Sequence, residues 1–232
     1  MRNELVNETP LTSDKTVNQR QSRSEATQDA LMHAAVTLIA ENGLENISIR
    51  SIIEASGQKN ESALQYHFKS RDGLIKAIHK RHSAKIDQQR QKMFAALNTE
   101  KKPQLIDVAT LMVGPPFELA KVDPGFRLYI QAFGRDVVFS EIPAVQFLNQ
   151  RGKTTGNISQ ALKQILPTLS KDALRSRMDS AVRFSSMSMS LHARSKTAFK
   201  GKSAELFYSR LKDSLVGILG AKESATTKAL GS

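Results

Sequence analysis

The sequence predicts an all-α protein in which a three-helix, helix-turn-helix head is joined to a larger helical bundle, with about nine helices in total. Apolar residues recur at three- and four-residue spacing, which is the pattern of amphipathic helices, and no segment alternates with the period of two that is typical of strands. Serine, glycine and proline stand where such helices would begin and end. We expect four parts: a flexible arm at 1–23, the head at 24–78, the bundle at 79–220 and a flexible tail at 221–232.

The composition excludes several kinds of chemistry. Cysteine is absent, so disulfide bonds, thiolate metal sites and thiol nucleophiles are excluded. The chain has no apolar stretch of about 18 residues, and we expect a cytoplasmic protein without a membrane segment. The formal net charge is +12, yet residues 1–82 hold 11 Lys and Arg against 10 Asp and Glu. The positive excess therefore lies in the bundle, and net charge is only weak support for binding to nucleic acid.

Local signals place the first two helices of the head. A helix is expected from Ser24, where an apolar stripe begins, to Gly43, which suits a C-cap. Ser48 is a good N-cap residue for a second, shorter helix. Gly57 closes that helix and opens a turn.

A third and a fourth helix follow this turn. Leu64 and Phe68 are four residues apart, which predicts one apolar face on a helix over 60–68. Ser70 is an N-cap residue for a much longer helix over about 71–97. Two short helices joined by a glycine-containing turn form the helix-turn-helix pattern.

Prolines divide the remainder of the chain into segments. A proline cannot donate a backbone hydrogen bond inside a helix, so each one is expected where a helix starts or stops. The pair Pro115 and Pro116 is expected to separate two helices. The bundle helices are expected near residues 104–114, 117–121, 124–139, 144–166, 171–198 and 203–219.

The order of these elements, and the residues within them, resemble the TetR family of bacterial repressors. The resemblance rests on the runs AAVTLIAENG at 34–43, SIRSI at 48–52, ASG at 55–57, LQYHF at 64–68 and SRDGL at 70–74. The stretch from Gly57 to Phe68 is one residue longer than the commonest family pattern, and Gln65 stands where tyrosine is usual. The resemblance covers about a third of the chain. It implies a homodimeric transcription regulator that binds a pseudo-palindromic operator and is released by a small-molecule effector, with no cofactor.

The third helix is expected to enter the major groove of double-stranded DNA, where side-chain amides can read adenine edges. Gln65 and Asn60 are the candidates for reading bases, and their neighbours are expected to position the head on phosphates. The residues expected to contact DNA are Ser48, Arg50, Lys59, Asn60, Ser62, Ala63, Gln65, Tyr66, His67, Lys69 and Arg71. Two alternatives stay open: His67 could be a core histidine, and Arg50 and Arg71 could be ordinary solvated charges.

The bundle is rich in aromatic and aliphatic residues, which favours a cavity for a small, mostly apolar effector. The candidate lining residues are Phe117, Phe126, Arg127, Tyr129, Ile130, Phe133, Phe147, Arg183 and Phe184. The arginines and the tyrosine would supply polar anchors. The alternative is that these side chains form only the core.

Small serines alternate with methionines over 184–191, and the last long helix has an apolar stripe. Small residues permit close helix approach, so this region is expected to form the interface between two copies of the chain. The candidate interface residues are Met187, Met189, Phe207, Leu211, Leu215 and Ile218. The alternative is a core within one subunit.

Two other classes of function compete with a ligand-responsive regulator. An enzyme is disfavoured because the sequence has no nucleophile elbow, phosphate loop or paired carboxylates in an apolar run. His79 and His82 are three residues apart but lack a third metal ligand with matching spacing, so we expect a solvated pair and no metal. The second competitor is a helix-turn-helix protein that binds DNA constitutively or architecturally and needs no cavity.

Overall fold

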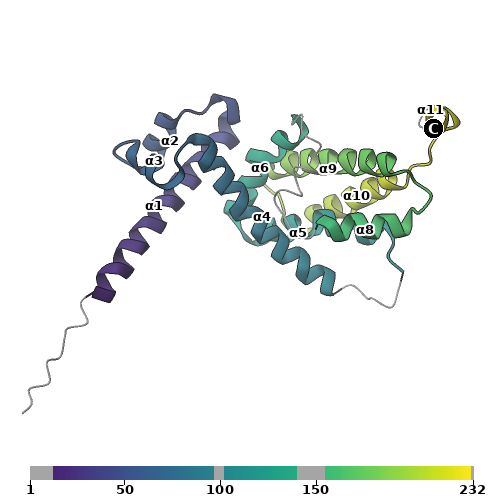
Figure 1. The fold of residues 1–232 in the computed structure, drawn as a ribbon, viewed down its shortest axis with the longest axis horizontal. Helices are drawn as coiled ribbons and strands as arrows, with labels where there is room; N and C mark the ends of the chain where they lie inside the picture. The colour runs from purple at the N-terminus through teal and green to yellow at the C-terminus, as the bar shows by residue number, and fades with distance from the viewer. Residues whose placement is uncertain (1–12, 97–101, 140–154, 231–232) are drawn as a thin grey trace, which may run out of the picture.

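The computed structural model describes residues 13–96, 102–139 and 155–230. These ranges consist of helices and turns without a strand, which confirms the predicted all-α class. The head lies at one end of the molecule and the bundle at the other, and α4 (Arg71–Ala95) runs from the head along the bundle (Figure 1).

The head is built from α1 (Ser13–Asn42), the 3-10 turn η1 (Leu44–Asn46), α2 (Ile49–Ala55) and α3 (Ser62–Phe68). Gly43 and Gly57 adopt φ angles of 87° and 70°, a region that favours glycine. As predicted, α1 and α2 therefore end beside these two glycines. The side chain of Ser48 accepts a hydrogen bond from the Ser51 backbone at the start of α2. The buried side chains at the centre of the head include Leu31, Ala35, Ile39, Ile52, Leu64 and Phe68.

The turn between α3 and α4 depends on Gly73. The Ser70 hydroxyl accepts a hydrogen bond from the Gly73 amide at 3.0 Å, which caps α4. A Cβ atom on Gly73 would lie 1.9 Å from the carbonyl oxygen of Phe68. Only glycine therefore lets the end of α3 approach the first turn of α4 this closely.

The bundle contains α5 (Leu105–Val122), α6 (Pro124–Phe139), α8 (Thr155–Ile165), α9 (Lys171–Ala193) and α10 (Gly201–Gly220). Helix α6 packs along α9, and α5 packs against both α4 and α10. Helix α6 also packs against α1 and η1, so it connects the bundle directly to the head.

Glycine also permits the close contact between α6 and α9. A Cβ atom on Gly134 would lie 2.5 Å from the Cβ of Ser190 and 2.8 Å from the carbonyl oxygen of Ser186. The small side chains of the serine-rich stretch on α9 thus serve close packing within the subunit.

Several predicted boundaries are corrected. Helix α1 begins at Ser13, so the expected arm at 1–23 is helical from that residue, because polar residues such as Gln and Arg form helices without an apolar stripe. A short helix, α11 (Ala225–Leu230), lies within the expected tail. The helix expected at 144–166 is described from Thr155 to Ile165, and its first part lies outside the described residues.

The predicted break at Pro115 and Pro116 is wrong, because both prolines lie inside the continuous helix α5. Pro115 cannot donate to the carbonyl of Leu111, four residues earlier. Arg90 on α4 replaces the missing donor, with its Nε 3.0 Å from the Leu111 oxygen. A side chain distant in sequence thus offsets part of the cost of the proline.

Candidate DNA-binding surface and ligand cavity

The exposed face of α3 is fixed by the two residues that it buries. Leu64 and Phe68 lie in the core of the head, and Gln65 and Tyr66 are exposed on the opposite side. The Tyr66 side chain is 74% exposed, an unusual state for a large aromatic residue. Both residues are therefore accessible to a DNA groove.

The turn before α3 presents exposed polar residues, among them Lys59, Asn60 and Ser62. The Asn60 side-chain oxygen accepts a hydrogen bond from the Ser62 amide at 3.1 Å. Since this contact stabilises the start of α3, the Asn60 oxygen is engaged within the protein. Ala63 is half-buried against the core of the head, which leaves it little surface for DNA.

Three other candidates have exposed side chains with local contacts. Ser48 caps α2, and Arg50 forms an ion pair with Glu54 at 3.2 Å. The Lys69 ammonium donates to the Tyr66 carbonyl at 3.4 Å. An exposed ion pair of this kind contributes little to stability, so Arg50 can turn to a phosphate at low cost.

Arg71 and His67 are less accessible than the sequence implies. The Arg71 guanidinium donates to the Leu44 carbonyl in η1, and its Nε is buried without a hydrogen-bond partner. Arg71 thereby ties the start of α4 to η1, and this internal contact engages the guanidinium that was predicted to contact phosphate. His67 is half-buried and lies edge-on to the Tyr66 ring, with 4.9 Å between ring centroids.

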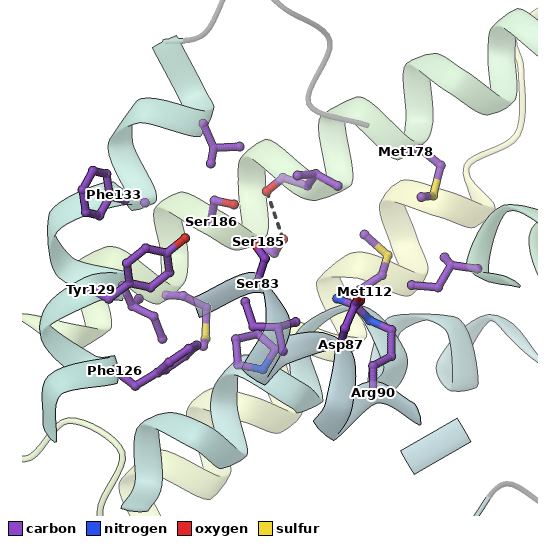
Figure 2. A pocket seen from close by; sticks show the side chains of 18 residues that line it. Ser83, Asp87, Arg90, Met112, Phe126, Tyr129, Phe133, Met178, Ser185 and Ser186 are labelled. Atoms are coloured by element: carbon purple, nitrogen blue, oxygen red, sulfur yellow. Dashed lines mark hydrogen bonds and ion pairs between the residues drawn. The ribbon is translucent and has the colours of Figure 1, made fainter. Parts of the chain in front are cut away.

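The bundle contains a cavity of about 160 Å³ among α4, α5, α6, α8 and α9 (Figure 2). Of the predicted lining residues, the structure places Phe126, Tyr129, Ile130 and Phe133 at its wall. The complete wall consists of Ser83, Ile86, Asp87, Arg90, Met112, Pro116, Phe126, Tyr129, Ile130, Phe133, Gly134, Val137, Ile158, Met178, Val182, Ser185, Ser186 and Met189.

The other predicted lining residues lie elsewhere. Phe117 is buried and stacks on Tyr208 with ring centroids 4.3 Å apart. Phe184 is 40% exposed on the outer face of α9, and Arg127 is absent from the cavity wall. Phe147 lies outside the described residues.

Arg183 has a structural role in place of the predicted ligand contact. Its Nη1 donates to the carbonyls of Val137 and Val138 at 3.0 and 2.6 Å, and its Nε pairs with Asp179 at 2.7 Å. The two carbonyls belong to the last described turn of α6. Arg183 therefore holds the end of α6 against α9.

The polar part of the cavity wall was not predicted from the sequence. Asp87 and Arg90 form an ion pair at 3.1 Å, and their side chains are only 15% and 10% exposed. Burial lowers the pKa of Arg90, and the carboxylate of Asp87 acts in the opposite direction. The signal was present in α4, because His79, Ser83, Asp87 and Arg90 recur at three- and four-residue spacing and so share one helix face.

His79 is buried, and His82 is half-buried with its Nδ1 inaccessible to solvent, so the expectation of a solvated pair is wrong. The Nδ1 of His79 lies 3.1 Å from the Tyr129 hydroxyl, and the His82 ring stacks on Tyr129 with centroids 4.0 Å apart. Burial, with a smaller contribution from the neighbouring Lys85, lowers the pKa of His82 to about 4. His82 is therefore neutral at pH 7, and the two imidazoles join α4 to the cavity residue Tyr129.

The predicted interface residues divide into two groups. Met189, Leu211 and Leu215 are buried within the subunit; Met189 lines the cavity, and Leu211 lies at the wall of a surface groove between α9 and α10. Met187, Phe207 and Ile218 are half-buried. The periodicity had identified the apolar stripes correctly but could not divide them between the core and the surface.

The outer face of α9 and α10 carries two exposed apolar residues that lie within the segments expected to form the interface. Leu191 is 60% exposed and Leu206 is 50% exposed, beside the exposed ring of Phe184. A surface groove between the two helices is lined by Phe184, Ser188, His192, Ser203, Leu206, Phe207, Arg210, Leu211 and Ser214. Neighbouring exposed apolar side chains of this kind are typical of interaction surfaces.

No set of three His, Cys, Asp or Glu side chains among the described residues is grouped closely enough to hold a metal ion. None of the described helices combines the length and the apolar character needed to span a membrane.

The chain is similar to known bacterial regulatory proteins. Residues 31–78 match the family model described as bacterial regulatory proteins, tetR family. A TetR family transcription regulator from Marinobacter aquaeolei VT8 has a similar structure, with a TM-score of 0.52, 15% identity and coverage of 83% of this chain and 97% of that chain. A tetR-family transcriptional regulator from Streptomyces coelicolor gives a TM-score of 0.45 at 16% identity, with coverage of 88% of each chain. No curated protein matches the chain. The helix-turn-helix arrangement that α1 to α4 form is therefore similar to that of the tetR family of bacterial regulatory proteins over residues 31–78, and the fold of the chain is similar to that of a TetR family transcription regulator.

Proposed function

We propose that this DNA-binding regulator is a cytoplasmic homodimeric repressor that a small, mostly apolar effector releases from a pseudo-palindromic operator. The observation that carries the proposal is the position of the cavity. Its wall includes Ser83 and Asp87 of α4 and Tyr129 of α6. Helix α4 continues directly from α3, and α6 packs against α1 and η1. Both helices that would sense a ligand therefore also contact the DNA-binding head.

The contacts of Tyr129 support a coupling between the cavity and the head. Tyr129 lines the cavity, bonds to His79 and stacks on His82. His79 follows the buried Ile78, at the point where α4 leaves the head. A ligand that displaces the Tyr129 ring would therefore change the packing of α4 close to α3. The protein would leave its operator to the extent that the ligand binds this changed packing of α4 more tightly than the original one.

The proposed dimer forms through the outer face of α9 and α10, where Phe184, Leu191 and Leu206 are exposed. A two-fold dimer presents two copies of α3 to DNA, which matches the symmetry of a pseudo-palindromic operator. Exposed lysines and arginines on each head, such as Lys59 and Lys69, would contact phosphates, and DNA binding would then weaken strongly with added salt.

The test combines operator selection with ligand binding. Binding-site selection supplies an operator, thermal-shift screening supplies a ligand that raises the melting temperature, and fluorescence anisotropy measures operator affinity with and without that ligand. We expect the ligand to lower operator affinity in the wild type. Val182→Phe, which fills part of the cavity, should keep DNA binding and lose the response. Ligands that bind but leave operator affinity unchanged would favour the constitutive DNA-binding alternative.

A further inference from the structure

The cavity has room for one aromatic ring. Its volume is about 160 Å³, and an apolar cavity of about 150 Å³ in a protein core is known to hold benzene. The cavity is therefore large enough for a compact, single-ring ligand.

The shape of the wall favours a flat ligand. Tyr129 lies with its ring centroid 5.7 Å from that of Phe126 and 5.3 Å from that of Phe133, so the three rings form one side of the cavity. Met112 and Met178 lie toward the other end, as Figure 2 shows. Aromatic rings and polarizable thioethers both make favourable contacts with the faces and edges of an aromatic ring.

The charges of the wall favour a neutral ligand. Asp87 and Arg90 are the ionised side chains of the wall, and they pair with each other at 3.1 Å while both are largely buried. Arg90 also donates to the Leu111 carbonyl, so its guanidinium is held in the protein framework. A charged ligand would bring an uncompensated charge into this site, which is costly in a largely buried environment.

The polar atoms of the wall favour a ligand that donates a hydrogen bond. The Ser185 hydroxyl donates to the Val182 carbonyl at 3.0 Å, which leaves lone pairs for a ligand. The Asp87 carboxylate is an acceptor only. Pro116 has no N–H to give to the carbonyl of Met112, four residues earlier in α5, and both residues line the cavity.

We infer that the cavity takes a neutral single-ring aromatic compound with a hydroxyl group, a phenol, whose hydroxyl donates to the Met112 carbonyl that Pro116 leaves without a helical donor, while the ring lies against Phe126, Tyr129 and Phe133. The inference rests on the proposed function, because it names the class of effector for the same cavity. Phenol itself is neutral at pH 7, like the tyrosine side chain.

The test uses four probes of similar size on the purified full-length protein: phenol, toluene, benzoate and benzylammonium. Isothermal titration calorimetry should show phenol bound at least as tightly as toluene, although the phenol hydroxyl is better hydrated in water. Benzoate and benzylammonium should bind at least about tenfold more weakly than phenol. Tighter binding of either ion, or toluene bound more than about tenfold more tightly than phenol, would overturn the inference.

A matched pair of variants tests the acceptor beside Pro116. Pro116→Ala supplies an N–H to the Met112 carbonyl and should reduce the preference for phenol over toluene by about 2- to 10-fold. Pro115→Ala makes the same change one residue earlier, at a carbonyl that Arg90 already bonds, and should leave the preference unchanged. If Pro116→Ala and Pro115→Ala showed the same preference for phenol over toluene, the Met112 carbonyl would not be the acceptor of the phenol hydroxyl.

Operator binding separates this inference from the proposed function. If a charged aromatic probe binds in the cavity and releases the operator, the ligand class is wrong and the proposed function stands. If phenol binds with the expected selectivity but the operator stays bound, the ligand class stands and the proposed effector response is wrong.

Discussion

The Nε of Arg90 on α4 donates to the carbonyl of Leu111 on α5, which is the carbonyl that Pro115 leaves without a helical donor. The same guanidinium pairs with Asp87 at 3.1 Å. One side chain therefore completes the backbone hydrogen bonding of a second helix, neutralises a buried carboxylate and forms part of the cavity wall. The proline pair and the ion pair are parts of one structural unit.

Arg90→Met should destabilise the fold by about 3–5 kcal/mol, because it leaves the Asp87 carboxylate buried without its partner. The double variant Asp87→Leu with Arg90→Met removes both charges and should be more stable than the single variant. Urea unfolding followed by circular dichroism measures both free energies. If the double variant were as unstable as Arg90→Met alone, the loss would come from the Leu111 carbonyl and from packing rather than from the unpaired charge.

The buried imidazole of His82 should make stability depend on pH. Its pKa is about 4 in the folded protein against an ordinary value of 6.5, so the unfolded chain binds a proton at higher pH than the folded chain does. The contribution of His82 is therefore complete above pH 6.5 and is lost as the pH falls from 6.5 toward 4, up to about 3 kcal/mol.

His82→Phe is the control for this pH dependence, because it keeps a ring against Tyr129 and removes the titrating group. The difference in unfolding free energy between the two proteins, followed from pH 7.5 to pH 4.5, cancels the contribution of the shared carboxylates. A difference that stays constant over this range would show that His82 does not titrate in this way.

Gln65 should read a base. Its side chain is uncharged, exposed on α3 and one residue after the buried Leu64, so Gln65→Ala should cost about 1–3 kcal/mol at one base pair per half-site. Binding-site selection with the variant should show relaxed preference at one symmetric position. Arg50→Ala should instead weaken all sequences alike and reduce the salt dependence. If Gln65→Ala instead lowered the affinity for all DNA sequences alike, base reading would be assigned to the exposed neighbour Tyr66.

The dimer interface can be tested with charges on its exposed apolar residues. Phe184→Glu together with Leu206→Glu should convert the dimer to a monomer at micromolar concentration, because the two residues are 40% and 50% exposed on one groove. Analytical ultracentrifugation measures the change in mass. Val122→Glu places the same charge on a residue that is 79% exposed at the end of α5, and it should remain a dimer. Retention of the dimer in the double variant would place the interface elsewhere.

Features that depend on neighbouring residues were predictable from the sequence. Ser48 and Ser70 cap the helices that follow them, and Gly43 and Gly57 end the helices before them, because a cap needs only the backbone a few residues away. These local signals placed the end of α1, the starts of α2 and α4 and the exposed face of α3, but not the start of α1.

Features that depend on distant contacts could not be predicted in this way. Pro115 stays inside α5 because Arg90, far away in the sequence, replaces its donor. The stripe that contains Met189 and Leu215 showed that these residues would be buried, but periodicity does not distinguish burial within a subunit from burial between subunits. Arg183 was expected at a ligand and instead holds the end of α6.

Helix α9 faces two sites at once, since Ser185 and Met189 lie at the cavity and Phe184 and Leu191 lie on the outer surface. In the proposed dimer, the cavities of the two subunits are then separated by this helix and its symmetry mate. A ligand that moves Met189 would also shift the outer face of α9, which the partner subunit contacts in the proposed dimer. Effector binding would then be cooperative, with a Hill coefficient that differs from one and returns to one when the dimer is split.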